Sequence, residues 1–276
     1  MDVFFKKRIL TSIIMVPLLI LLLLSPLPFI IVAVMLASIA GLYEYYEAVG
    51  LKEHKGLCFA GYIAAIIIPL AEFISIQAIQ MLVYIFVLGL FVIMLACHKK
   101  VTLKHIGLIM MGLIYIPYFL SHIIYIRSME FGIFYIWLVF IGACMTDTFA
   151  YFTGCSIGGK KLCPGISPKK TIAGAVGGVV GCGLSFLIFG LIVNYFFLGA
   201  LDGNKMSLLL LFVLGLISAV ISQIGDLTAS VIQRQYGIKD FGSIFPGHGG
   251  ILDRCDSIIL VAPVIFLFLL KIGIMI

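Results

Sequence analysis

The fold of this chain is decided by residues 206–232, which read MSLLLLFVLGLISAVISQIGDLTASVI. The run contains a single charged residue, Asp226, and it is longer than the roughly 20 residues that a helix needs to cross a bilayer. Lipid offers no hydrogen-bond partners to the backbone, so a segment of this kind crosses the membrane as a helix. The stretch therefore predicts a transmembrane helix that carries one acidic side chain.

The composition of the whole chain extends this prediction. Of its 276 residues, 63% are hydrophobic and only 11% are charged, whereas soluble domains have about 25% charged residues. So little charge cannot cover a globular surface, which excludes an ordinary soluble domain. Strong apolar runs recur along the chain, so we expect one transmembrane unit over 1–276, with scaffold and lipid-access helices in 1–130 and the catalytic motifs in 131–276.

The apolar runs predict an all-α, polytopic integral membrane protein with about nine transmembrane helices. Charges, prolines and glycines bound these runs at roughly 9–25, 27–47, 57–75, 78–97, 105–126, 132–153, 172–198, 206–232 and 255–276.

The distribution of basic residues supports this count and gives an orientation. With nine spans, fifteen of the 18 Lys and Arg residues fall on one side, and only Arg127, Lys205 and Lys271 fall on the other. Basic residues concentrate in cytoplasmic loops, which predicts a cytoplasmic N-terminus. The net charge of +6 is scattered over short loops and gathers on no single face, so we expect no nucleic-acid partner.

Polar side chains recur every four residues in the run 206–232 and just beyond it. Residues at this spacing line one face of a helix. Two interpretations remain open: a packing face in which the aspartate pairs with a basic side chain, or a functional face. The cost of a carboxylate at membrane depth favours function for the aspartate. The stripe consists of Ser218, Ser222, Asp226, Ser230 and Arg234.

Two further regions carry ionisable groups on the same predicted side. Asp147 lies near the end of the run 132–153, and the loop after it contains four lysines, which could also be an ordinary positive-inside loop. If the last helix begins near Leu252, Asp253 and Asp256 lie one turn apart and can bind a divalent cation, with Asp253 as a simple helix cap as the alternative. Aspartates beside many cations are typical of phosphate chemistry.

Three smaller features complete the pattern. We expect Tyr43, Glu44, Tyr45, Tyr46 and Glu47 to form an interfacial aromatic belt, with Glu44 facing a polar cytoplasmic funnel as the alternative. The glycines between Gly174 and Gly183 favour close helix packing within the chain over a dimer seam. His248 is a candidate phosphate contact and is not expected to be a general base, because no hydrolase triad surrounds it.

The motifs of the C-terminal half resemble a known enzyme signature. Gly225-Asp226-Leu227, Ser230, Arg234, Lys239-Asp240 and the run Pro246-Gly247-His248-Gly249-Gly250-Ile251-Leu252-Asp253-Arg254-Cys255-Asp256-Ser257 closely resemble the phosphatidate cytidylyltransferase family, also called CDP-diacylglycerol synthases. Upstream, Asp147, Tyr151, Gly154, Ser167-Pro168-Lys169-Lys170-Thr171 and Gly174 are similar to the loop of that family. The family usually has Lys at the position of Gln233 and an acidic residue at that of Ala173.

The resemblance implies transfer of a cytidylyl group from CTP to phosphatidic acid, with release of pyrophosphate. It further implies Mg²⁺, with a second cation as an open alternative, a homodimer among membrane lipids, and a bacterial-type inner-membrane location with a cytoplasmic active site. The implied catalytic residues are Asp226, Asp253, Asp256, Lys239 and Arg254, of which the three aspartates would bind the metal. The implied substrate-binding residues are Asp147, Ser167, Lys169, Lys170, Thr171, Ser222, Ser230, Arg234, His248, Gly249 and Gly250.

Two other functions remain as alternatives. A CTP-dependent lipid kinase acting on a polyprenol would attack the γ-phosphate and release CDP. An ion-coupled transporter or scramblase would use the buried aspartates to bind a coupling ion, but such proteins usually have broken helices in corresponding positions of two halves. The aspartates concentrate in one half of this chain, which disfavours the transporter.

Overall fold

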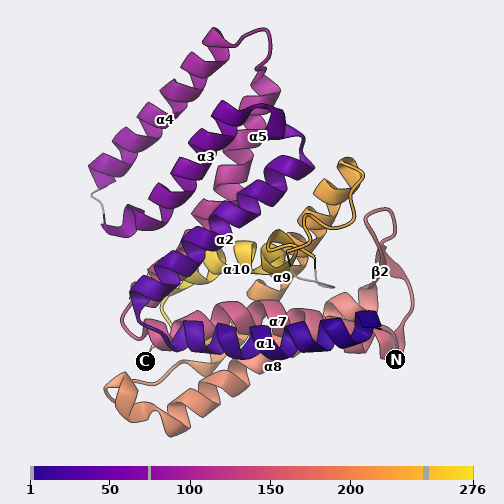
Figure 1. Cartoon of the computed structure of the whole chain (residues 1–276). Coiled ribbons are helices and arrows are strands. Elements are labelled where there is room, and N and C mark those ends of the chain that lie inside the picture. The colour runs from indigo at the N-terminus through magenta and orange to yellow at the C-terminus, as the bar shows by residue number, and fades with distance from the viewer. Residues whose placement is uncertain (1–2, 74–75, 245–248, 276) are drawn as a thin grey trace. The chain divides into compact units, whose positions relative to one another are not determined.

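The computed structural model describes residues 3–73, 76–244 and 249–275 (Figure 1). Most of this chain is helical. The helices are α1 (Val3–Leu24), α2 (Leu27–Ala48), α3 (Lys55–Ile67), α4 (Ile76–Ala96), α5 (Leu103–Leu113), α6 (Phe119–Ser128), α7 (Gly132–Ile157), α8 (Ile172–Phe196), α9 (Leu208–Gln235) and α10 (Leu252–Lys271). Short 3₁₀ turns lie at Leu51–Glu53, Ile68–Phe73 and Leu198–Leu201, and one π-helical turn at Ile114–Tyr118 joins α5 to α6.

Five helical segments of the described chain are long and apolar enough to cross a membrane: Leu27–Ala48, Leu103–Ser128, Gly132–Ile157, Ile172–Phe196 and Leu208–Gln235. Three shorter apolar helices lie at Met15–Leu24, Lys55–Ala71 and Gln80–Ala96. The all-α membrane class is therefore confirmed, and each apolar run read from the sequence overlaps a helix. The count of nine spans and the cytoplasmic N-terminus stay predictions.

The chain folds into two compact units. The first contains residues 1–125 and 236–254, and the second contains residues 126–235 and 255–276. The segment between α9 and α10 thus belongs with the N-terminal helices, although it follows α9 in sequence.

In the first unit, α2, α3 and α5 pack against one another (Figure 1). Glycines make room for two rings of α2 here, because a Cβ at Gly61 would collide with Tyr46 and one at Gly112 would approach Tyr45 to 2.8 Å. Tyr45 and Tyr46 are consequently 2% and 0% exposed. The aromatic-belt interpretation is therefore wrong for these two tyrosines, since their rings form part of the core. Tyr43, 48% exposed, and Glu47 are exposed as expected.

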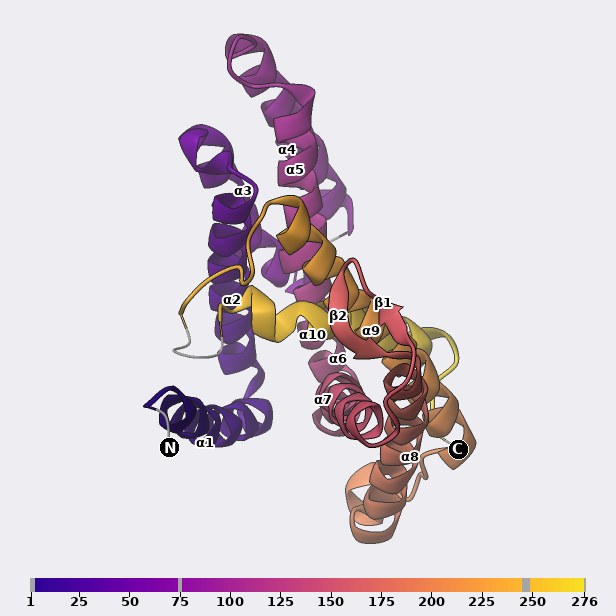
Figure 2. The same ribbon diagram turned by 90° about the vertical axis from the view of Figure 1, so that its right-hand side faces the viewer.

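In the second unit, α8 packs against both α7 and α9 (Figure 2). Its glycines allow the close approach: a Cβ at Gly177 would collide with Thr153, one at Gly181 with Phe149, and one at Gly183 would come within 2.8 Å of Leu216. These neighbours all belong to the same chain, which confirms the prediction of packing within the chain.

A β-hairpin connects α7 to α8, which the all-α prediction did not include. Strands β1 (Lys161–Cys163) and β2 (Ser167–Thr171) pair antiparallel. The chain leaves α7 through Gly158 and Gly159, whose φ angles of 65° and 91° favour glycine. The hairpin therefore carries the lysine-rich loop as an ordered element (Figure 2).

Candidate functional site

A cavity of about 500 Å³ lies in the second unit, lined by α7, the hairpin, the start of α8 and one residue of α9. Three lysines and one carboxylate supply its charge. The polar lining includes Asp147, Lys161, Lys169, Lys170, Thr171 and Gln223. An excess of positive charge in a concave site of this size suits a polyanionic ligand.

The end of the hairpin is also the start of α8. The Thr171 hydroxyl accepts a hydrogen bond from the Gly174 amide at 3.0 Å and caps the helix. A Cβ at Gly174 would lie 2.6 Å from the Ala150 carbonyl oxygen, so α7 and α8 approach closely at this point. Two motif residues, Thr171 and Gly174, thus fix the wall of the cavity.

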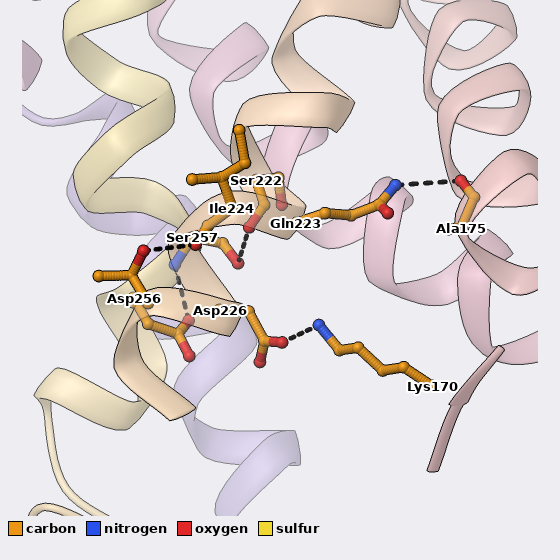
Figure 3. Close-up of polar contacts among 9 residues, drawn as sticks. Lys170, Ala175, Ser222, Gln223, Ile224, Asp226, Asp256 and Ser257 are labelled. Carbon is orange, nitrogen blue, oxygen red and sulfur yellow. Dashed lines mark hydrogen bonds and ion pairs between the residues drawn. The ribbon is translucent and has the colours of Figure 1, made fainter. Parts of the chain in front are cut away.

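Lys170 connects the hairpin to α9. Its ammonium forms an ion pair with the carboxylate of Asp226, which points toward it (Figure 3). Both side chains are less than a third exposed, at 28% and 29%. Burial lowers the pKa of Lys170, while the negative charges of Asp147 and Asp256 act in the opposite direction. The packing-face interpretation of the α9 stripe is therefore correct in one respect, because its carboxylate does pair with a basic side chain.

The predicted polar side chains of α9 become more exposed toward the C-terminal end of the helix. Ser218 and Ser222 are fully buried, Asp226 and Ser230 are partly exposed, and Arg234 is exposed. Neither serine hydroxyl has a hydrogen-bond partner among the described residues. The face thus ends in a partly solvated carboxylate, with an exposed cation two turns beyond it.

The start of α10 lies against α9. A Cβ at Gly225 would lie 2.6 Å from the Asp256 carbonyl oxygen, and the Ser257 hydroxyl donates to the Ser222 carbonyl at 3.3 Å (Figure 3). The Asp256 carboxylate accepts from the Ser257 amide at 2.7 Å. This close contact brings Asp226 and Asp256 onto neighbouring helices of one unit (Figure 3).

Asp253 lies in the first unit, and α10 begins at Leu252 as expected. Its carboxylate accepts hydrogen bonds from the amides of Gly250 at 2.7 Å and Phe241 at 3.0 Å. Asp253 thus lies in the first turn of α10, where its charge complements the helix dipole, but its carboxylate binds amides that precede the helix and does not cap the first turn. Its role as a metal ligand stays a prediction.

The aromatic-belt interpretation is wrong for Glu44 as well as for Tyr45 and Tyr46. It is 2% exposed, and its carboxylate accepts hydrogen bonds from the amides of Ile251 and Leu252 at 3.0 and 2.9 Å. The glycine-rich segment 239–254, which we call the signature segment, is therefore bound by a side chain of α2 through two of its described residues. The signal in the sequence was an acidic residue at the end of an apolar run.

The remaining predicted residues do not gather in the cavity. Lys239 and Arg254 are exposed, Ser167 is partly buried, and Gly249 adopts a φ of 82°. His248 lies outside the described residues. Among the described residues, no three Asp, Glu, His or Cys side chains lie close enough together to bind one metal ion by themselves.

Nearly the whole chain matches a known protein family. Residues 6–272 match the model described as the Cytidylyltransferase family. The chain belongs to that family. Its relatives include proteins named phosphatidate cytidylyltransferase from Bacillus subtilis (strain 168), 31% identical over 96% of this chain and 97% of the relative, and from Thermotoga maritima, 30% identical over 95% of each.

A third family member with that name, from Rickettsia prowazekii (strain Madrid E), is 40% identical over 70% of this chain and 83% of its own length. Because the alignments with the Bacillus and Thermotoga proteins include at least 95% of each relative, the similarity covers the helical scaffold as well as the signature motifs.

Proposed function

We propose that this membrane protein transfers the cytidylyl group of CTP to phosphatidic acid, giving CDP-diacylglycerol and pyrophosphate. The observation that carries the proposal is the lysine-lined cavity beside the Lys170–Asp226 pair, in a chain whose relatives bear the name of this enzyme.

The charge of the cavity suits the triphosphate of CTP. Lys161, Lys169 and Lys170 line one wall and can neutralise phosphate oxygens. Gln223, which holds α9 to α8 through a 3.0 Å hydrogen bond to the Ala175 carbonyl, lines the same cavity. The cations Arg234, Lys239 and Arg254 remain predicted phosphate contacts outside this lining.

The reaction needs positioning more than it needs a protein base. An oxygen of the phosphatidate monoester attacks the α-phosphorus of CTP, and the bond from that phosphorus to the oxygen of the β-phosphate breaks, releasing pyrophosphate. The nucleophile is already anionic at neutral pH, so no proton has to be removed by a side chain. The lysines would stabilise the charge that collects on the leaving pyrophosphate.

The acidic groups of the site suit Mg²⁺. This ion prefers oxygen ligands, keeps several waters, and is usually bound by one or two carboxylates together with substrate phosphates. Asp226 and Asp256, two partly exposed carboxylates on neighbouring helices, provide such a set. Bound Mg²⁺ would neutralise the CTP phosphates. Asp253 as a third ligand, a second cation and a homodimer stay predictions.

CTP is soluble and phosphatidic acid lies in the leaflet, so the active site should open to both. We propose that it lies on the cytoplasmic side, as the distribution of basic residues predicts, and that the membrane is a bacterial inner membrane, as the bacterial relatives suggest.

The proposal is tested with purified protein, Mg²⁺, phosphatidic acid and CTP labelled at either the α- or the γ-phosphate. Cytidylyl transfer puts the α-label into the lipid fraction and leaves the γ-label in pyrophosphate. A lipid kinase would put the γ-label into lipid, and a transporter would put neither there; either result would overturn the proposal. Asp226→Asn should abolish the transfer, whereas Asp202→Asn, in the exposed loop before α9, should not.

A further inference from the structure

Both oxygens of the Glu44 carboxylate accept hydrogen bonds from the backbone of the signature segment. Its two oxygens accept from the successive amides of Ile251 and Leu252 at 3.0 and 2.9 Å, across 207 and 208 residues of sequence. Being 2% exposed, the side chain has little room to contact a substrate. The carboxylate therefore binds another part of the protein and not a substrate.

The position of Glu44 supplies a helix cap that the local sequence lacks. The first amides of a helix have no partner within the helix, and a side chain at the residue before it usually accepts from them. That residue is Ile251 here, which has no acceptor in its side chain. The negative charge of Glu44 also lies at the positive end of the α10 dipole.

Two glycines of the signature segment make room for this carboxylate. A Cβ added at Gly242 or at Gly250 would collide with the Glu44 carboxylate group. Both glycines have ordinary negative φ angles, so their backbone conformation alone does not require glycine. The close approach of Glu44 does.

The Asp253 carboxylate also binds backbone amides of this segment. It accepts from Gly250, the residue directly before the two that Glu44 binds, and from Phe241, the residue directly before Gly242. Two carboxylates therefore bind four amides of one segment, with Glu44 on α2 and Asp253 within the segment. A change at Glu44 therefore removes contacts to the backbone residues that directly precede Asp253.

We propose that Glu44 is a positioning residue for the cytidylyl transfer, which sets the orientation of the Asp253 turn of α10 without touching substrate. The inference rests on the proposed function, in which Asp253 serves the metal-assisted reaction. Partners that orient metal-binding residues typically affect metal affinity or activity by about 10- to 100-fold.

The test uses Glu44→Gln, which keeps the shape but turns one acceptor into a donor facing a backbone amide. Folded protein is checked by size-exclusion chromatography in detergent, and kcat, KM for phosphatidic acid and the Mg²⁺ concentration for half-maximal activity are measured. We expect kcat to fall about 10- to 100-fold, the Mg²⁺ requirement to rise, and KM for phosphatidic acid to stay unchanged. Glu44→Asp should recover part of the activity.

Glu47→Gln is the matched control, because Glu47 lies one turn away on α2 and its exposed carboxylate pairs only with the exposed Lys52 among the ion pairs of the described chain. It should behave as the wild type. In hydrogen exchange, Glu44→Gln should speed exchange in peptides covering 249–254, whereas Glu47→Gln should not.

A folded Glu44→Gln protein with the wild-type Mg²⁺ requirement would overturn the inference. So would a loss of activity that is fully accounted for by a smaller fraction of folded protein. If Glu44→Gln does not fold, Gly242→Ala replaces it, because the added methyl displaces the same carboxylate. The Mg²⁺ requirement and the activity of Gly242→Ala are then judged in the same way. A wild-type protein that puts no α-label into lipid would instead refute the proposed function, so the two failures are distinguishable.

Discussion

Replacing Lys170 by methionine tests what the ion pair with Asp226 contributes at the cavity. Methionine has a similar length and keeps the apolar stem, but it removes the charge that the Asp226 carboxylate contacts. The substitution leaves a partly buried carboxylate without its ionic partner and removes one of the three lysines of the cavity. Activity should fall because the phosphate site and the position of Asp226 are lost together.

The size of the effect follows from the exposure of the pair. Both side chains are less than a third exposed, so solvent screens the interaction only in part. A hydrogen bond from the Lys170 ammonium to a charged group contributes about 1.5–3 kcal/mol. If Lys170 makes such a bond to a CTP phosphate in the transition state, its loss corresponds to a decrease of roughly 10- to 140-fold in kcat/KM for CTP. Lys169 lines the same cavity but is exposed, so Lys169→Met should cost at most about 1 kcal/mol, or roughly fivefold.

The assay follows α-labelled CTP into lipid at several CTP concentrations for the wild type and both variants. Lys205→Met, at an exposed position in the loop before α9, serves as the control for loss of one positive charge. Equal losses for Lys170→Met and Lys169→Met would refute the reasoning, because the general charge of the cavity and not the ion pair would then set the effect.

Four further outcomes are expected. Asp256→Asn should lower kcat at least about 100-fold if its carboxylate binds the metal with Asp226, as measured by transfer of α-label beside Asp202→Asn. Removing divalent cations with EDTA should abolish transfer, and Mg²⁺ should restore it, while Ca²⁺ should restore it poorly because it prefers more ligands at longer distances. Thr171→Val should lower the free energy of unfolding by about 1 kcal/mol through loss of the α8 cap, and Thr171→Ser should not; thermal unfolding in detergent checks this. Gly177→Ala should destabilise by about 1–3 kcal/mol because its methyl would collide with Thr153, whereas Gly89→Ala, in an open position on α4, should be neutral or stabilising.

The helices could be predicted from the sequence because apolar runs must be helical in lipid. The run 27–47 corresponds to α2 at Leu27–Ala48, and Leu252 begins the last helix as expected. Breaks inside helices were harder to foresee: the run 105–126 contains a π-helical turn around Pro117, which periodicity alone does not locate. The hairpin was missed because its strands have only three and five residues, and polar lysines gave them the composition of a loop.

The candidate site was predictable where its residues lie close in sequence and less so where they meet across the fold. Asp226 stands out in the sequence because a carboxylate is costly in lipid. Pairing with a basic group is one of the two interpretations that the sequence leaves open, and only the structure identifies Lys170 as the partner. The aromatic residues around Glu44 favour a place in the membrane interface, with a polar funnel as the alternative. Its true partners are backbone amides more than 200 residues away, and a backbone amide has no signature in the sequence.

The long separation of Glu44 from its partners also bears on how the protein is made. The amides of Ile251 and Leu252 are synthesised 207 and 208 residues after Glu44. At about 5–20 residues per second, the growing chain contains α2 for roughly 10–40 seconds before those amides exist. During this interval the Glu44 carboxylate lacks the two amide donors that bind it in the finished protein. The packing around Glu44 can therefore be completed only after the start of the last helix has been synthesised.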